Sequence, residues 1–190
     1  ALTTPIINAW AFVAIILGII FYNETISEIQ IAAIALIVLG VFATVFKKDA
    51  KIAFNEGFFL SVISMLVWGF FFFALKAPVF LYGALVVTFI VKLSTSLFSL
   101  PVAIVKKVNL LETRKKTVLL ILLVGFLDGL GFLAYNIAVG LAPVSIVAPI
   151  VSSVPALSVF LAVIVLKERL SRNQKIGIIA TIAGILLVSI

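Results

Sequence analysis

The sequence predicts an all-α protein, a polytopic membrane helix bundle with seven transmembrane helices. The first observation is composition, since 65% of the 190 residues are hydrophobic, 11% are charged and the mean hydropathy is +1.41. In a soluble globular protein about a quarter of the residues are charged. This chain has too few charged residues to form a surface that water would solvate. The second observation is a series of apolar stretches of about 20 residues, the length that crosses a bilayer as a helix. The third is an internal repeat.

The predicted spans follow one another through short connectors. In hydrocarbon every backbone N–H and C=O group needs a partner within the segment, so continuous apolar stretches are expected to be helices. The alternating pattern of a transmembrane β-strand is absent. We place the spans near residues 4–22, 28–46, 57–75, 81–105, 117–139, 144–166 and 173–190.

The end of the chain repeats its beginning at a constant offset of 144 residues (149 − 5, 168 − 24, 184 − 40). The residues repeated are Pro5, Glu24, Ser27, Gln30 and Gly40, which recur as Pro149, Glu168, Ser171, Gln174 and Gly184. The chain therefore contains a duplicated membrane unit. Residue 1 aligns with Ser145, inside the second copy, so we expect three further helices to precede this sequence in the parent protein.

The second and seventh spans begin with a capping box. Ser27 is followed three residues later by Gln30, and Ser171 by Gln174. In this motif the hydroxyl and the amide each bind a backbone group that the first turn of a helix leaves unpaired. Each copy therefore ends in a tight helical hairpin.

Glu24 and Glu168 precede these caps, at the end of the preceding helix, where the helix dipole disfavours an anion. Two interpretations are open. We expect plain carboxylates at the membrane interface, because exposed ion pairs contribute little to the stability of a fold. The alternative is that each carboxylate binds a donor elsewhere in the fold.

Positive charge gathers on one side of the predicted membrane. Twelve of the fourteen Lys and Arg residues lie in three alternate connectors: Lys47, Lys48 and Lys51; Lys106, Lys107, Arg114, Lys115 and Lys116; and Lys167, Arg169, Arg172 and Lys175. The opposite connectors hold only Lys76. Lys and Arg favour the cytoplasmic side, so we expect the C-terminus outside. This bias accounts for the net charge of +7 without a nucleic-acid partner.

The chain has no Cys and no His. These absences exclude thiolate nucleophiles, disulfides, ordinary zinc sites and imidazole proton relays. The sequence also lacks the glycine-rich phosphate-binding motifs, so ATP-driven transport has no support. We therefore expect no enzyme activity, no metal and no cofactor.

Several of these segments resemble the EamA-type transporters of the drug/metabolite transporter superfamily. The resemblance rests on Pro149 to Val165, Leu166-Lys167-Glu168-Arg169-Leu170-Ser171, Gln174, Gly177 and Ala183 to Val188, on the weaker copy Pro5, Asn23 to Ser27, Gln30 and Gly40-Val41, and on Val67-Trp68-Gly69. It implies two five-helix repeats in inverted orientation. Residues 1–46 would be the last two helices of the first repeat, 47–56 a basic linker and 57–190 the second repeat.

The family moves amino acids, sugars, nucleotide-linked compounds and drugs, so the resemblance leaves the substrate open. Its members usually keep both termini in the cytoplasm. We nevertheless follow the Lys/Arg bias, which places this C-terminus outside.

Two charged residues lie at mid-depth, Lys92 in span 81–105 and Asp128 in span 117–139. Because a charge at the centre of a bilayer is costly, both should face the protein interior and pair. Helical spacing extends each into a polar stripe. The stripes comprise Thr88, Lys92, Thr95 and Ser99 on one helix and Asp128, Tyr135 and Asn136 on the other.

Two roles are open for this pair. Lys92 and Asp128 either contact a substrate or coupling ion directly, which we favour, or form a structural ion pair whose neighbouring hydroxyls bond back to carbonyls of their own helix. Asn8 and Ser152 occupy matched positions in the two copies and are expected to add polar contacts to the same centre.

Three further patterns have structural interpretations. Pro5 and Pro149 kink or loosen their helices. Gly125 and Gly129 are spaced for close helix packing. The aromatic run Phe70 to Phe73 beside Trp68 is expected to face lipid.

The sequence thus predicts a secondary transporter or exporter of small metabolites, amino-acid-like or drug-like, in the cytoplasmic membrane. Lys92 would hold an anionic group, while Asp128 would either balance it or bind a cationic group. This pair suits a zwitterion, with protons as the coupling ion. The expected partners are the substrate and the lipid bilayer, and no nucleic acid is expected. The sequence does not decide whether the protein forms a homodimer. The alternative is a non-transporting membrane scaffold or lipid-associated assembly subunit.

Overall fold

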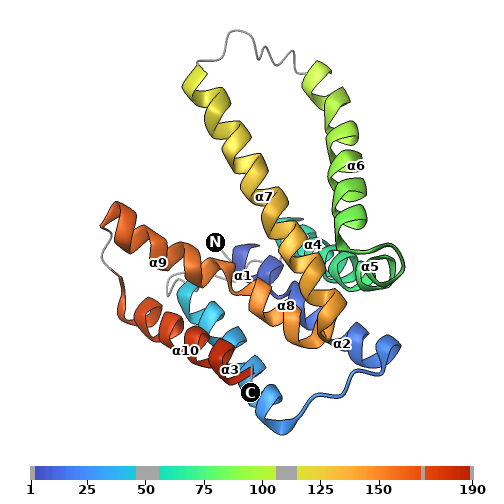
Figure 1. Cartoon of the computed structure of the whole chain (residues 1–190). Coiled ribbons are helices and arrows are strands. Elements are labelled where there is room, and N and C mark those ends of the chain that lie inside the picture. Colours follow the sequence, from blue (N-terminus) through green and yellow to red (C-terminus); the bar gives the residue numbers. More distant parts are fainter. Residues whose placement is uncertain (1–2, 46–55, 106–114, 168–169, 189–190) are drawn as a thin grey trace. The chain divides into compact units, whose positions relative to one another are not determined.

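The computed structural model describes residues 3–45, 56–105, 115–167 and 170–188, and in these ranges every regular element is an α-helix (Figure 1). The prediction of an all-α, polytopic helix bundle is confirmed. The helices are α1 (Thr3–Asn8), α2 (Trp10–Tyr22), α3 (Glu28–Val45), α4 (Glu56–Ala74), α5 (Lys76–Tyr82), α6 (Ala84–Val105), α7 (Lys115–Leu141), α8 (Val144–Ser152), α9 (Val154–Leu166) and α10 (Arg172–Val188).

Five helical segments of the described ranges are long and apolar enough to cross a membrane. They are Glu28–Val45, Glu56–Tyr82, Ala84–Pro101, Thr117–Leu141 and Val144–Val165. The other two predicted spans correspond to a shorter apolar segment, Ile6–Tyr22, and to α10, which has 17 residues.

The first and sixth predicted spans are each interrupted by one residue. Ala9 separates α1 from α2 with φ −72° and ψ 1°, and Ser153 separates α8 from α9 with φ −77° and ψ −3°. The two residues are 144 positions apart (153 − 9). Each break follows a proline, Pro5 or Pro149, by four residues, and the second break also precedes Pro155, which has no N–H group to continue the backbone bonds of α8 into α9. Each span nevertheless continues across its break: Val144–Val165 is long and apolar enough to cross a membrane, as predicted, and Ile6–Tyr22 forms the shorter first segment.

The amide at each break bonds three residues back rather than four. The Ser153 N–H donates to the Ile150 carbonyl at 3.2 Å, and the Ala9 N–H donates to the Ile6 carbonyl at 3.0 Å. In the second copy the Pro149 carbonyl, which Ser153 would have bound in a regular helix, accepts a bond from the Ser152 hydroxyl at 2.8 Å. A side chain thus replaces the lost backbone partner.

Both capping boxes are confirmed. The Ser27 N–H donates to Gln30 Oε1 at 3.0 Å while the Gln30 N–H donates to Ser27 Oγ at 3.3 Å. The corresponding distances for Ser171 and Gln174 are 2.9 and 3.3 Å. Two short side chains therefore fix where α3 and α10 begin.

The helices form two compact units, one of residues 1–74 and 142–190 and the other of residues 75–141. In the first unit α3 and α10, the equivalent helices of the two copies, lie side by side (Figure 1). Gly40 lies against Gly177, and Gly184 lies against Ala33. A later residue of α3 therefore contacts an earlier residue of α10. The two helices are antiparallel, which is the relation that inverted copies require.

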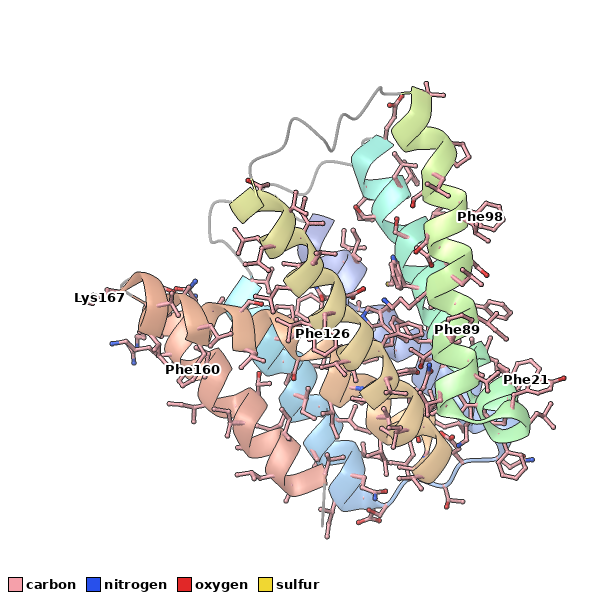
Figure 2. All side chains as sticks on the ribbon, turned by 45° about the horizontal axis from the view of Figure 1, so that its top comes forward. Phe21, Phe89, Phe98, Phe126, Phe160 and Lys167 are labelled. Atoms are coloured by element: carbon pink, nitrogen blue, oxygen red, sulfur yellow. The ribbon has the colours of Figure 1, made fainter. Side chains whose placement is uncertain are left out.

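The aromatic run on α4 divides between packing and exposure. Phe72 stacks on Trp10 with 4.4 Å between ring centroids, and Phe73 is buried beside Tyr22. Phe70 is exposed, as expected of a residue that faces lipid. Elsewhere, the labelled phenylalanines of α6, α7 and α9 are exposed, and Figure 2 shows Phe89 and Phe98 extending outward from α6. Such surfaces suit a hydrocarbon environment.

Candidate functional site

Lys92 of α6 and Asp128 of α7 form an ion pair in the second unit, with 2.5 Å between Nζ and Oδ2. The predicted pairing is confirmed. The Lys92 ammonium also lies 4.7 Å from the centre of the Phe132 ring, within the range of a cation–π contact. Within the described structure the Asp128 side chain is 67% exposed and that of Lys92 33% exposed, so the pair is open to a groove rather than packed over.

A second polar contact joins α6 and α7, one helical turn before Lys92 on α6. The Asn136 side-chain amide donates to the Thr88 hydroxyl oxygen at 2.8 Å. Thr88 and Lys92 are one turn apart on α6, and Asn136 and Asp128 are two turns apart on α7, so each helix contributes one face. These two polar contacts fix the register of α6 against α7.

Four hydroxyl groups of α6, those of Thr88, Thr95, Ser96 and Ser99, donate to carbonyls of their own helix. Thr88 donates to the Ala84 carbonyl at 2.7 Å and Thr95 to the Val91 carbonyl at 2.8 Å, as the structural interpretation predicted. Ser99 donates to the Ser96 carbonyl, also at 2.8 Å. The Thr88 oxygen already accepts from Asn136, whereas the oxygens of Thr95 and Ser99 keep lone pairs that can accept further hydrogen bonds.

A groove of about 560 Å³ opens over the ion pair, a size typical of small-molecule sites. Its lining residues are Leu85, Thr88, Phe89, Lys92, Thr95, Ser96, Gly125, Phe126, Asp128, Gly129, Leu130 and Leu133. Gly125 and Gly129 were predicted to permit close packing, but in the described structure no atom lies within 4 Å of a Cβ built on either. Their missing side chains widen the groove instead.

Not every residue of the two predicted stripes reaches this groove. Tyr135 is 3% exposed and Asn136 is 0% exposed, and neither lines it, nor does Ser99. Within the described residues Asn136 Oδ1 has no hydrogen-bond partner. Ser96, by contrast, lines the groove although the sequence analysis passed over it; its position four residues after Lys92 was the available signal.

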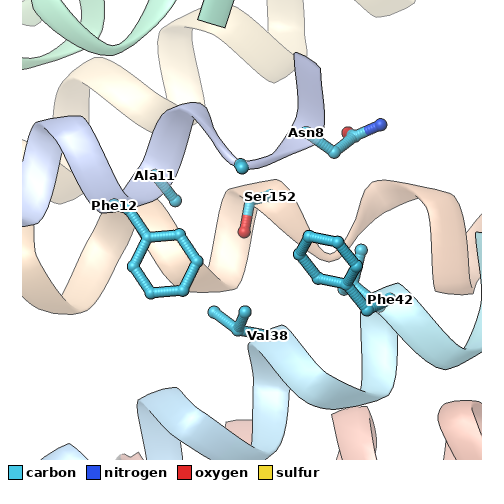
Figure 3. Close-up of a pocket in the computed structure, with 8 residues that line it drawn as sticks. Asn8, Ala11, Phe12, Val38, Phe42 and Ser152 are labelled. Atoms are coloured by element: carbon cyan, nitrogen blue, oxygen red, sulfur yellow. The ribbon is translucent and has the colours of Figure 1, made fainter. Parts of the chain in front are cut away.

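Asn8 and Ser152 line a different cavity, in the first unit, where the two broken helices meet α3. It encloses about 10 Å³, the room of about one water molecule. Figure 3 shows Ser152 between Phe12 and Phe42, with the Asn8 amide directed away from it. The structure thus brings these matched polar residues to one cavity. That they share a centre with Lys92 and Asp128 stays a prediction.

Glu24 is bound more specifically than we predicted. Its two carboxylate oxygens accept hydrogen bonds from the backbone N–H groups of Val144 and Ser145, at 2.8 and 2.9 Å. The expectation of a plain interfacial carboxylate was therefore wrong for this copy. Glu168, its counterpart, lies outside the described residues.

Residues 55–190 match the model of the EamA-like transporter family. No curated protein matches the chain. A crystal structure, described only as that of a protein, is similar at a TM-score of 0.76 with 15% sequence identity, and the match covers 98% of this chain. The chain spans 66% of that structure's length, and at this identity the likeness shows the fold alone.

Proposed function

Because the chain belongs to the EamA-like transporter family, a family of membrane transporters of small molecules, we propose that it is a secondary transporter of small metabolites that works by alternating access in the cytoplasmic membrane. The chain is a multi-pass membrane protein with helices long enough to span a bilayer. The two copies would exchange conformations, so that a substrate site opens first to one side and then to the other.

The observation that carries this proposal is the structural equivalence of the two copies. The breaks at Ala9 and Ser153 have nearly the same backbone angles. The last helix of each copy, α3 or α10, runs antiparallel to the other and in direct contact with it. Inverted copies built around discontinuous helices are the usual basis of alternating access.

The groove between α6 and α7 is the proposed substrate site. The hydroxyl groups of Thr95 and Ser96 donate to the carbonyls of Val91 and Lys92, which leaves their oxygens able to accept hydrogen bonds, and the exposed Asp128 carboxylate lines the same groove. A substrate ammonium would bind these acceptors, and a substrate carboxylate would draw the Lys92 ammonium away from Asp128. A zwitterionic, amino-acid-like metabolite therefore suits the groove. Asp128, once released from Lys92, is the group proposed to take up a coupling proton.

The alternative function is a membrane scaffold that moves no substrate. It predicts that Lys92 and Asp128 form a purely structural pair, which apolar residues of similar size can replace without loss. The two proposals therefore differ in what removal of both charges does.

The test is uptake and efflux of a metabolite panel in membrane vesicles that contain the native protein or a Lys92→Met, Asp128→Leu double variant. We expect transport of at least one zwitterionic metabolite by the native protein and its loss in a double variant that remains folded. Glu56→Gln, which changes an exposed carboxylate at the start of α4, is the control. Undiminished transport by the double variant would remove the pair from the substrate site.

A further inference from the structure

The Glu24 carboxylate connects two parts of the chain that are 120 residues apart in sequence. Glu24 lies in the connector between α2 and α3. Its carboxylate accepts hydrogen bonds from the N–H groups of Val144 and Ser145, in the first turn of α8. First-turn N–H groups have no partner within their own helix, and the helix dipole favours an anion beside them. Hydrogen bonds to an ionised carboxylate are about twice as strong as neutral ones. This contact therefore holds the beginning of α8.

Position 18 decides whether the carboxylate fits. A Cβ built on Gly18 would lie 2.7 Å from Oε2 of Glu24, too close for both atoms to remain. The obstructed group is the end of a flexible side chain, so a methyl group would displace the carboxylate and leave the helix intact. Gly18 thus provides the space for this contact.

The second copy has the same backbone turn at this place, with an alanine where the first copy has Gly18. Asn23 and Lys167, 144 positions apart, both adopt the left-handed conformation, with φ of 50° and 56°. Their N–H groups bond to the carbonyls of Gly18 and Ala162, again 144 positions apart. Ala162 carries the methyl group that Gly18 lacks.

We propose that Glu24 is a latch, which holds the beginning of α8 against the α2–α3 connector in this conformation and releases it when the transporter changes conformation. The inference rests on the proposed function. At its other end α8 reaches Ser152, which lines the small cavity beside Asn8, so movement of Val144 is carried through nine helical residues to the break. Glu24 positions α8 and touches no substrate.

The experiment uses a single cysteine in this cysteine-free chain. Ser145 is 0% exposed, and in the described structure its hydroxyl has no hydrogen-bond partner, so Ser145→Cys loses no bond. We measure its rate of reaction with a small thiol reagent in membranes, with and without Glu24→Gln or Gly18→Ala. The amide of glutamine offers one acceptor oxygen in place of two. Either change is expected to raise the rate about tenfold or more, the effect of losing a bond to a charged group.

Two controls separate the latch from general loosening. Glu28→Gln removes an exposed carboxylate four residues away and should leave the rate unchanged. Ser61→Cys, at a serine in α4 that is 1% exposed, should stay unreactive in the Glu24 and Gly18 variants. An unchanged rate at Ser145→Cys, or an equal rise at Ser61→Cys, would overturn the latch.

A transported metabolite tests release itself. In the Ser145→Cys protein with Glu24 intact, its addition should change the labelling rate as the conformations redistribute. A protein that transports while this rate stays constant would contradict release and leave the proposed function standing. If no metabolite of the panel is transported while Glu24→Gln still raises the labelling rate of Ser145→Cys, the proposed function is rejected. The release of α8 during transport is then rejected with it.

Discussion

Gly184 of α10 packs directly against Ile37 of α3, where a Cβ on the glycine would lie 2.7 Å from Ile37 Cγ1 and 2.9 Å from its backbone nitrogen. The backbone atoms cannot move aside as a flexible side chain can. Gly184→Ala should therefore lower the free energy of unfolding by about 1–3 kcal/mol, as overpacking does. Thermal unfolding in detergent measures the effect.

Gly125→Ala is the matched control, because no atom of the described structure lies within 4 Å of a Cβ at that position. It should leave stability unchanged or raise it by up to about 1 kcal/mol, since alanine favours a helix more than glycine. Equal losses in the two variants would refute the close contact between α3 and α10.

Thr88 and Asn136 supply the second prediction. Thr88→Val removes the acceptor of the buried Asn136 amide and should cost about 1–2 kcal/mol. A Thr88→Val, Asn136→Leu double variant should recover much of that loss, because no buried polar group is then left unpaired. A double-mutant cycle on thermal stability checks the coupling. Additive losses would show that the two side chains do not interact.

Local signals in the sequence predicted much of this fold. The spacing of Ser27 and Gln30 fixed a helix start because a capping box involves residues only three apart. The pairing of Lys92 with Asp128 was predictable because each charge needs a partner in an apolar environment.

Contacts between distant segments were less accessible from the sequence. Whether Glu24 has a partner depends on where Val144 lies and on the space above Gly18, neither of which has a local signature. The exposure of Asp128 likewise depends on how α6 and α7 diverge around the groove. The helix breaks were only hinted at by the prolines, because a proline bends some helices and interrupts others.

Orientation is the third prediction. The Lys/Arg bias places the connector before α10 in the cytoplasm and the connector between α2 and α3 outside. Thr25 and Asn173 are exposed in these connectors or beside them, so Thr25→Cys and Asn173→Cys suit labelling. An impermeant thiol reagent applied to intact cells should label Thr25→Cys and spare Asn173→Cys. The reverse pattern would show that the usual orientation of the family prevails.

The central claim is that Lys92 and Asp128 carry the transport chemistry, and the most direct measurement compares two modes of transport in vesicles. Asp128→Asn should abolish accumulation driven by a pH gradient yet retain part of the exchange of substrate across the membrane, because only the proposed proton acceptor is lost. Lys92→Ala should weaken substrate binding in both modes. Gradient-driven accumulation and exchange that both persist at native rates in a folded Asp128→Asn variant would contradict the account.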